Sequence, residues 1–218
     1  MDVQITSAVG VLNNALNSGD VVTVTAHFSE AQTLNTSGGF PSVALNIGGT
    51  TVNATYASSA GTTNLLFTYT ILAGQTDANG IAIEANSLSL NGSTLKDPRT
   101  NTTTLSVPAT TDNSSFTVDT TAPSLSITSS VSQLKSGETA TLTFTFSEDP
   151  GNTFTWNGTA GDVSLSGGTL GAISGTGTTR TAVFTPGVGV NAGTASIAVN
   201  SGAYQDAAGN NGGAGGTP

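Results

Sequence analysis

The stretch VVTVTAHFSE at residues 21–30 and the stretch TATLTFTFSE at residues 139–148 are two copies of one pattern. In each copy, apolar residues alternate with Thr and other polar residues, and the run ends on Phe-Ser-Glu. Alternation with a period of two is typical of a strand that buries one face. The closing glutamates, Glu30 and Glu148, are 118 residues apart. The chain therefore contains an internal repeat, which must be recognised before its parts are interpreted.

A second landmark also occurs twice. Asp97 is followed four residues later by Asn101, and Asp206 is followed four residues later by Asn210. Together the two landmarks predict tandem modules at residues 1–118 and 119–218. Between them runs VDTTAP, in which proline fixes φ and biases the preceding residue to extended geometry. We therefore expect a short, stiff linker.

The composition favours strands over helices. The 218 residues are rich in Thr, Ser, Asn, Gly and Val and poor in Lys, Glu and Arg, and long runs of helical periodicity are missing. Short strands separated by turns predict an all-β fold of two tandem immunoglobulin-like Greek-key sandwiches. The Gly48-Gly49 step predicts a tight hairpin. Other candidate strands include Val43–Ile47, Thr51–Tyr56, Leu65–Ile71, Ile81–Ile83 and Leu88–Leu90 in the first module, and Leu125–Thr128, Val163–Leu165, Arg180–Phe184 and Ala195–Val199 in the second.

The two modules differ after the Asp-x-x-x-Asn stretch. Module one has a candidate strand near Ser115–Val118, whereas residues 211–218 of module two show no equivalent strand pattern. Two explanations remain open: the sequence stops one strand early, or another chain donates the strand. An open sheet edge accepts such a strand.

The charge balance limits the partners. Thirteen acidic residues against four basic ones give a net charge of −9, and the four basic residues are too scattered to form a phosphate-binding groove. Nucleic acid is therefore not an expected partner. No apolar run reaches the ~20 residues that a membrane helix needs. An acidic, Lys-poor and Cys-free composition fits an extracellular bacterial protein, although the absence of Cys alone fits the cytoplasm equally well.

Acidic residues recur where strands end. In immunoglobulin-type wiring, Glu148 ends the second strand of module two at the pole where Asp119 enters. The loop of Asp206 precedes the final strand at that same pole. We therefore expect these three residues to converge, with Asp149 and Asn210 as further candidates. Calcium takes six to eight oxygen ligands from such groups, so the sequence predicts a Ca²⁺ site.

Further candidate ligands lie in module one. Asp20 and the turn containing Asp77 and Asn79 are expected at the pole that faces the predicted cluster, where they would complete an inter-module site. The alternative is that these are solvated loop residues, because Asp and Asn favour turns. Turn chemistry, however, does not require a Glu after both Phe-Ser pairs. The group equivalent to the predicted cluster in module one is Glu30, Asp97 and Asn101.

These segments resemble the bacterial immunoglobulin-like extender repeats of giant RTX-type adhesins exported by type I secretion. The resemblance rests on VDTTAP at 118–123, on Phe-Ser-Glu, and on DAAGN at 206–210. LNIGGTT at 45–51 and DANGI at 77–81 resemble a second repeat type of such proteins, so nearly the whole chain is covered. The resemblance implies calcium at module junctions, which stiffens a row of repeats projecting an adhesive tip from the cell surface. Module one departs from the pattern at DPRTN, residues 97–101.

Catalysis is not expected, because the chain has no Cys and its single histidine, His27, lies on the outward face of a predicted strand. We expect a structural spacer in an extracellular bacterial adhesin, with neighbouring repeats of the same polypeptide and calcium ions as partners. One alternative is a module that binds a glycan or a protein through an exposed Trp156 or the loop at residues 30–40. Another is a fibre subunit that borrows a strand.

Overall fold

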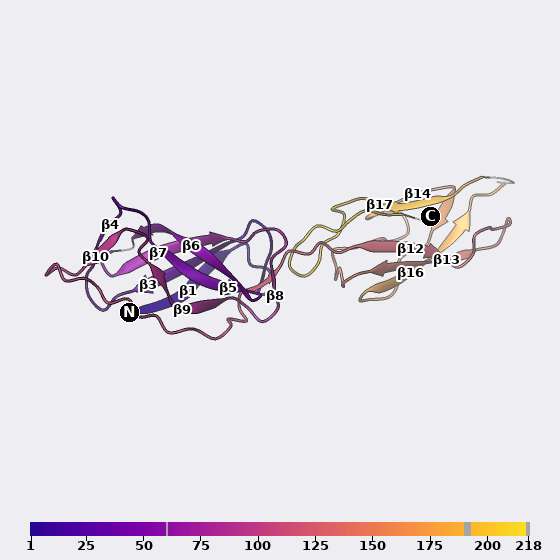
Figure 1. The fold of residues 1–218 in the computed structure, drawn as a ribbon. Helices are drawn as coiled ribbons and strands as arrows, with labels where there is room; N and C mark the ends of the chain where they lie inside the picture. The colour runs from indigo at the N-terminus through magenta and orange to yellow at the C-terminus, as the bar shows by residue number, and fades with distance from the viewer. Residues whose placement is uncertain (60, 190–192, 217–218) are drawn as a thin grey trace. The chain divides into compact units, whose positions relative to one another are not determined.

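The computed structural model describes residues 1–59, 61–189 and 193–216, and all regular structure in these ranges is β. The predicted all-β class is confirmed. The chain divides into two compact units, Met1–Thr121 and Ala122–Pro218, which we call module one and module two (Figure 1). The expected boundary between residues 118 and 119 falls inside a short strand, β11 (Thr117–Asp119), that belongs to module one.

Module one is built from one long antiparallel sheet and two small ones. The long sheet has the order β1-β3-β7-β6-β5-β9, and the small sheets are β10-β4 and β2-β11-β8. Besides β11, the strands are β1 (Asp2–Val9), β2 (Ala15–Leu16), β3 (Val21–His27), β4 (Thr33–Asn35), β5 (Ser42–Ile47), β6 (Thr50–Ser59), β7 (Asn64–Thr70), β8 (Thr76–Asp77), β9 (Ala82–Ser89) and β10 (Thr94–Lys96).

Strand β6 turns this long sheet into a sandwich. Its residues 50–55 pair with β5, and its residues 55–59 pair with β7. The register slips between Tyr56 and Ser58, and such a bulge bends and twists a strand. One strand therefore contributes to both layers, and the immunoglobulin-like sandwich closes around the core between them.

Local backbone geometry explains two features of the β5 neighbourhood. The predicted hairpin is confirmed: Ile47 pairs with Thr50, and Gly48 and Gly49 have φ of 56° and 83°, angles that suit glycine. The prediction of two separate strands at Ile81–Ile83 and Leu88–Leu90 is wrong, because β9 runs continuously through both. Asn86 adopts φ 51° inside it, and this irregularity interrupts the apolar pattern without ending the strand.

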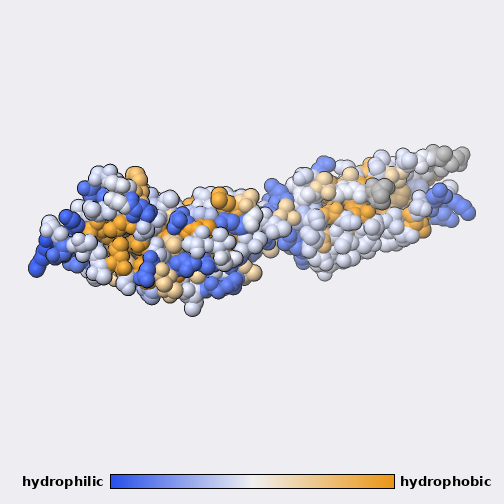
Figure 2. Space-filling model, viewed as in Figure 1, coloured by the Kyte–Doolittle hydropathy of each residue, from blue (hydrophilic) through white to orange (hydrophobic). Residues whose placement is uncertain are grey.

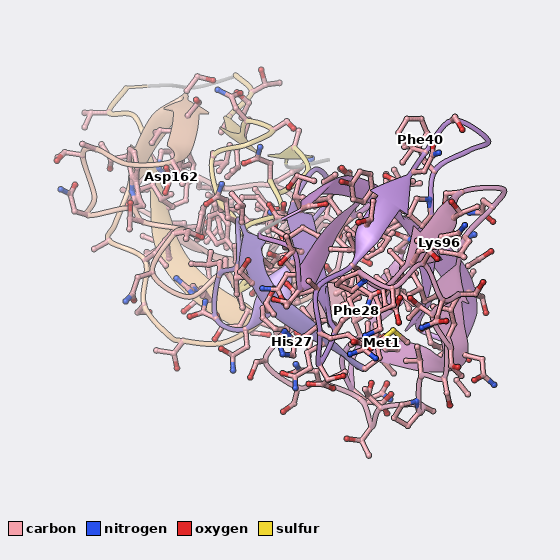
Figure 3. The ribbon with its side chains drawn as sticks, turned by 90° about the vertical axis from the view of Figure 1, so that its left-hand side faces the viewer. Met1, His27, Phe28, Phe40, Lys96 and Asp162 are labelled. Carbon is pink, nitrogen blue, oxygen red and sulfur yellow. The ribbon has the colours of Figure 1, made fainter. Side chains whose placement is uncertain are left out.

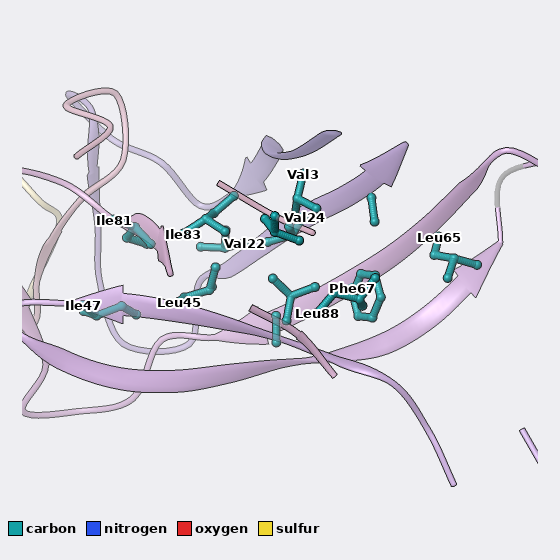
Figure 4. Packing of buried hydrophobic residues seen from close by; sticks show 14 of the residues in the cluster. Val3, Val22, Val24, Leu45, Ile47, Leu65, Phe67, Ile81, Ile83 and Leu88 are labelled. Atoms are coloured by element: carbon teal, nitrogen blue, oxygen red, sulfur yellow. The ribbon is translucent and has the colours of Figure 1, made fainter. Parts of the chain in front are cut away.

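The core of module one follows the predicted alternation. Val22, Val24 and Ala26 of β3 are fully buried, while their neighbours along the strand are half-exposed. Figure 4 shows labelled side chains of β1, β3, β5, β7 and β9 that belong to this core. Burying one such side chain contributes about 1.5–3 kcal/mol. On the face drawn in Figure 2, polar and near-neutral residues cover most of each module, and apolar colour is confined to limited areas.

Module two is a smaller two-sheet sandwich. One sheet has the order β12-β13-β16-β15 and the other β14-β17-β18. The chain passes from β14 to β15 at Gly167, where φ is 81° and a side chain would meet the backbone of Ala195. The strands are β12 (Leu125–Ser129), β13 (Ala140–Phe146), β14 (Val163–Ser166), β15 (Gly168–Leu170), β16 (Thr179–Pro186), β17 (Ser196–Val199) and β18 (Gly215–Gly216).

Strand β18 corrects the expectation that module two has no strand after its Asp-x-x-x-Asn loop. Gly215 pairs with Val199 and Gly216 with Ala198, so β18 extends the sheet at β17. Sequence patterning missed it because glycines carry no apolar signal. Packing explains the residue type: a Cβ on Gly215 would lie 2.7 Å from the side chain of Leu125. Thr217 and Pro218 lie outside the described residues.

Candidate metal centre

Three carboxylates converge in the structure. Asp119, Glu148 and Asp206 each offer one oxygen, and these oxygens lie within 4.8 Å of one another. Asp206 is buried and the other two are half-buried. In the part of the chain that the structure describes, no other group of three or more acidic or histidine side chains comes together in this way. Carboxylate oxygens gathered this closely are the donors that divalent cations such as Ca²⁺ take in proteins, so the arrangement is chemically suited to a metal ion.

Asp119 is held by the backbone of module one. It ends β11 and pairs with Thr76 of β8, while β11 runs parallel to β2 on its other side. The next residue strengthens this attachment. The Thr120 hydroxyl accepts a hydrogen bond from the Gly74 amide at 2.9 Å and donates one to the Gln75 carbonyl at 2.9 Å. The start of the linker is therefore fixed where Asp119 presents its carboxylate.

Glu148 follows strand β13 after one intervening serine. The Ser147 amide donates to the Ser124 carbonyl at 3.0 Å, and the Ser124 amide donates to the Ser147 hydroxyl at 2.9 Å. This reciprocal pair extends the β12–β13 ladder by one step beyond Leu125 and Phe146. The backbone next to Glu148 is thereby fastened to the linker.

Asp206 organises its own loop. Its Oδ1 accepts hydrogen bonds from the amides of Ala208 and Asn210, both at 2.9 Å, and its Oδ2 accepts one from the Asn210 side-chain amide at 2.9 Å. Gly209 takes φ 87°, which lets the loop turn back. The carboxylate is thus oriented by three donors. Because the side-chain nitrogen of Asn210 donates to Asp206, a cation would be coordinated by the side-chain carbonyl oxygen of Asn210.

The equivalent loop of module one has the same hydrogen bonds. Asp97 Oδ1 accepts from the amides of Arg99 and Asn101 at 2.8 Å, and Oδ2 accepts from the Asn101 side chain at 2.8 Å. The Asn101 side chain, together with these backbone amides, holds the pKa of Asp97 below its usual value of 3.8. Glu30 is exposed, and within the described ranges no group of three carboxylates forms around Asp97.

Asp149 lies next to the cluster in sequence, but its carboxylate serves a different contact. It accepts from Arg180 at 3.2 Å and from the Gly151 amide at 2.9 Å. Arg180 is 8% exposed and also donates to the carbonyl of Phe154 at 3.0 Å and to that of Gly151 at 2.5 Å. The pair therefore fastens the loop after Glu148 to strand β16.

The remaining candidates serve turns of module one. Asp77 is 4% exposed and accepts from the Gly48 amide at 2.8 Å and the Gly80 amide at 2.9 Å. These bonds tie the β5–β6 hairpin to the turn after β8. Asn79 donates to Asp112, and Asp20 accepts from the Asn17 amide at 2.8 Å. The role of these residues as metal ligands stays a prediction.

Two buried polar residues of module two were not singled out from the sequence. Arg180 supports the loop after Glu148, and Tyr204 lies two residues before Asp206 with 1% of its surface exposed. The internal repeat carries a signal for Tyr204: the position two residues before Asp97 holds Leu95, also 1% exposed. Comparison of the two copies thus identifies this position as part of the core.

Trp156 is not exposed, contrary to the requirement of a sugar-binding role. It is 9% exposed, and its Nε1 donates to the Leu170 carbonyl at 3.3 Å. The ring packs with Phe154 and other buried residues in the core of module two. An indole that covers the edge of a core commonly finds such a partner for its N–H.

Comparison with known proteins shows a family match for module two. Residues 119–217 match the family model of a bacterial Ig-like domain, and the match begins at Asp119 and includes all three carboxylates of the cluster. A search of curated proteins found no match. Within the described residues, no helix is long and apolar enough to cross a membrane.

Proposed function

We propose that the chain is a structural spacer of a large extracellular bacterial adhesin, and that calcium bound by Asp119, Glu148 and Asp206 stiffens the junction between its modules. The convergence of three carboxylates from separate segments carries the proposal. A spacer needs neighbouring repeats of the same polypeptide as partners, and the bacterial Ig-like match at residues 119–217 is compatible with a surface module of this kind.

The donor set suits Ca²⁺. Calcium prefers carboxylate, amide and backbone oxygens and accepts irregular geometry. The three carboxylates supply the charge, the carbonyl oxygen of Asn210 is a further candidate, and water would complete the coordination. Without a cation, three negative charges lie close together in partly buried positions, which is unfavourable. Calcium would therefore stabilise the folded arrangement of these segments.

The position of Asp119 at the start of the linker connects the proposed site with the stiffness of the junction between the modules. Its backbone is paired within module one, whereas Glu148 and Asp206 belong to module two. An ion held by all three would restrain the linker residues 120–123 further, in addition to the hydrogen bonds that hold Thr120 and the Pro123 carbonyl. Limiting that freedom keeps a row of repeats extended, as a spacer requires.

Thermal unfolding and small-angle X-ray scattering in CaCl₂ and then in chelator test the proposal. At a free calcium concentration of about 100 times the Kd, binding stabilises the folded state by about 2.7 kcal/mol. For a module of this size, that corresponds to a rise in Tm of roughly 10–20 °C. We also expect a longer maximum dimension with calcium. Unchanged melting together with an unchanged dimension contradicts the spacer mechanism.

A matched pair of variants tests where the calcium ion binds. Glu148→Gln removes a proposed ligand, and Glu30→Gln changes the glutamate at the same place in module one. We expect the first variant to reduce the calcium-dependent rise in Tm and the second to leave it intact. Equal behaviour of the two variants would show that the ion binds elsewhere.

One surface feature favours the alternative of ligand binding. Phe40 is 63% exposed and stacks on Tyr56 with ring centroids 6.4 Å apart, and its side chain stands at the edge of module one in Figure 3. Exposed aromatic rings can stack on sugars. Binding on a glycan array that Phe40→Ala abolishes would support this alternative, whereas a blank array leaves the spacer as the better account.

A further inference from the structure

Tyr204 connects the chain segments that carry the candidate ligands. It is 1% exposed, and its hydroxyl donates to the carbonyl of Pro123 at 3.2 Å. Pro123 lies four residues after Asp119. The amide of Gly213 donates to the same carbonyl at 2.9 Å. The last residues of the linker are therefore held by two donors from the segment that contains the Asp206 loop.

The ring of Tyr204 reaches the second segment. It packs edge-to-face against Phe146, with centroids 5.1 Å apart and planes at 75°, and Phe146 precedes Glu148 by two residues. It makes a similar contact with Phe154 at 6.1 Å. Such edge-to-face aromatic pairs add stability beyond area burial. The end of strand β13 is thus packed against the Tyr204 ring, so a shift of one would displace the other.

Tyr204 also borders the third segment. It precedes Asp206 by two residues, and its carbonyl accepts from the Gly212 amide at 2.8 Å on the far side of the loop. A Cβ on Gly212 would lie 2.3 Å from the Tyr204 ring, so the glycine is required for this close approach. One buried side chain therefore touches, or is part of, each segment that leads to a carboxylate of the cluster.

Module one shows what this position looks like without the hydroxyl. Leu95 precedes Asp97 by two residues and is 1% exposed, so the position is a core position in both modules. The Leu95 side chain packs in the core and has no hydroxyl to donate. The phenol is found in the copy that gathers three carboxylates and not in the copy that does not.

We propose that Tyr204 is a positioning residue for the cation site, and that its hydroxyl sets calcium affinity by holding the Pro123 carbonyl, and with it the linker that carries Asp119, against the Glu148 and Asp206 segments. This inference rests on the proposed function. A ligand set that is already in place loses less conformational freedom when the ion binds. Residues that orient metal ligands from outside the coordination sphere commonly change affinity by about 10–100-fold when they are replaced.

The test is calcium affinity by isothermal titration calorimetry on the full chain. Tyr204→Phe keeps the ring and removes the hydroxyl, so we expect affinity to fall by about tenfold. Tyr56→Phe is the matched control, because the Tyr56 hydroxyl also has a hydrogen-bond partner, the Ser59 hydroxyl at 2.9 Å, and lies in module one. Thermal unfolding in chelator measures the structural effect of each change separately.

The outcomes are distinct. If wild type binds no calcium at the cluster, the proposed function fails. If wild type binds and Tyr204→Phe lowers stability in chelator but keeps wild-type affinity, the hydroxyl is merely structural and only this inference is overturned.

A second measurement needs no variant. In wild-type protein with ¹³C-labelled tyrosine, calcium should shift the ring resonances of Tyr204 and leave those of Tyr56 and Tyr69 in place. An unmoved Tyr204 resonance at saturating calcium overturns the inference, even if Tyr204→Phe fails to fold.

Discussion

The loops at residues 97–101 and 206–210 have the same internal hydrogen bonds and different surroundings. In both, the aspartate accepts from the backbone amides two and four residues later and from the side chain of the final asparagine. Only the second loop joins a group of three carboxylates within the described residues. The Asp-x-x-x-Asn pattern therefore encodes a loop conformation, and Asp119 and Glu148 make the second copy a candidate metal site.

The two modules also differ at matched core positions. Leu65 of module one pairs with Ala26, and Arg180 of module two pairs with Phe144. Ala26 and Phe144 both precede the Phe of Phe-Ser-Glu by two residues, so Leu65 and Arg180 occupy equivalent places. Module two thus replaces an aliphatic side chain by a buried cation that supports the loop after Glu148.

The largest expected effect comes from removing the second aspartate. Asp206→Ala leaves three donors, two of them backbone amides in a partly buried loop, without their acceptor. Orphaned buried donors of this kind cost about 1–3 kcal/mol, and we expect a loss near 3 kcal/mol in the unfolding free energy of module two. Chemical denaturation in chelator measures it without the contribution of calcium.

Asp97→Ala is the matched change in module one. Asp97 is half-exposed, so water can replace part of its hydrogen bonding, and the loss of stability should be smaller than for Asp206→Ala. Calcium binding should disappear in the Asp206 variant and persist in the Asp97 variant. If both variants lose stability and calcium binding equally, the two copies are equivalent and the contrast drawn between their surroundings is wrong.

Arg180→Leu gives module two the residue type of Leu65 and tests whether the buried cation supports the loop. The change removes the donors to Phe154, Gly151 and Asp149, and we expect a loss of about 2 kcal/mol. Asp149→Asn is the control, because the Asp149 side chain is 53% exposed and an exposed ion pair contributes about 0–1 kcal/mol. If Arg180→Leu leaves the unfolding free energy of module two unchanged, aliphatic packing compensates fully for the lost hydrogen bonds, as it does for some buried ion pairs.

The sequence predicted what depends on local patterns. Alternation located β3 and β13, and Gly48-Gly49 located a hairpin. It did not predict features that depend on distant contacts. Asn86 interrupts the apolar pattern of β9 because it sits at a bulge, and β18 has a glycine at position 215 because a side chain there would meet Leu125.

For the candidate site, too, the sequence predicted some features and missed others. The immunoglobulin-like topology predicted that Asp119, Glu148 and Asp206 lie at one pole of module two. In the structure the carboxylates of these three residues do lie close together. The topology could not indicate that Asp77 accepts bonds from two turns or that Asp149 pairs with Arg180. Both partners come from segments that the sequence alone does not place next to these aspartates.

A smaller effect is expected from the turn residue of each loop. Thr100 takes φ 69° and Gly209 takes φ 87°, a conformation that costs a residue with a Cβ roughly 1–2 kcal/mol. Gly209→Thr should therefore destabilise module two by about 1 kcal/mol. Thr100→Gly should stabilise module one by about half as much, because glycine loses more backbone entropy on folding. Thermal unfolding measures both, with Thr102→Gly as a control that should only destabilise.

The smallest effect concerns the pH dependence of Asp97. Hydrogen bonds from Asn101 and the backbone hold the pKa of Asp97 below 3.8 in the folded state. A depressed carboxyl pKa contributes stability that is fully present above the unfolded pKa and is lost as pH falls through the folded pKa. Wild type should therefore exceed Asp97→Asn in stability near neutral pH, and the difference should shrink below about pH 4. Thermal scans of both proteins across this range test it, with the transition of module two as the internal reference. A difference that stays constant down to about pH 2 would show that the ionised form of Asp97 has no special role in its loop.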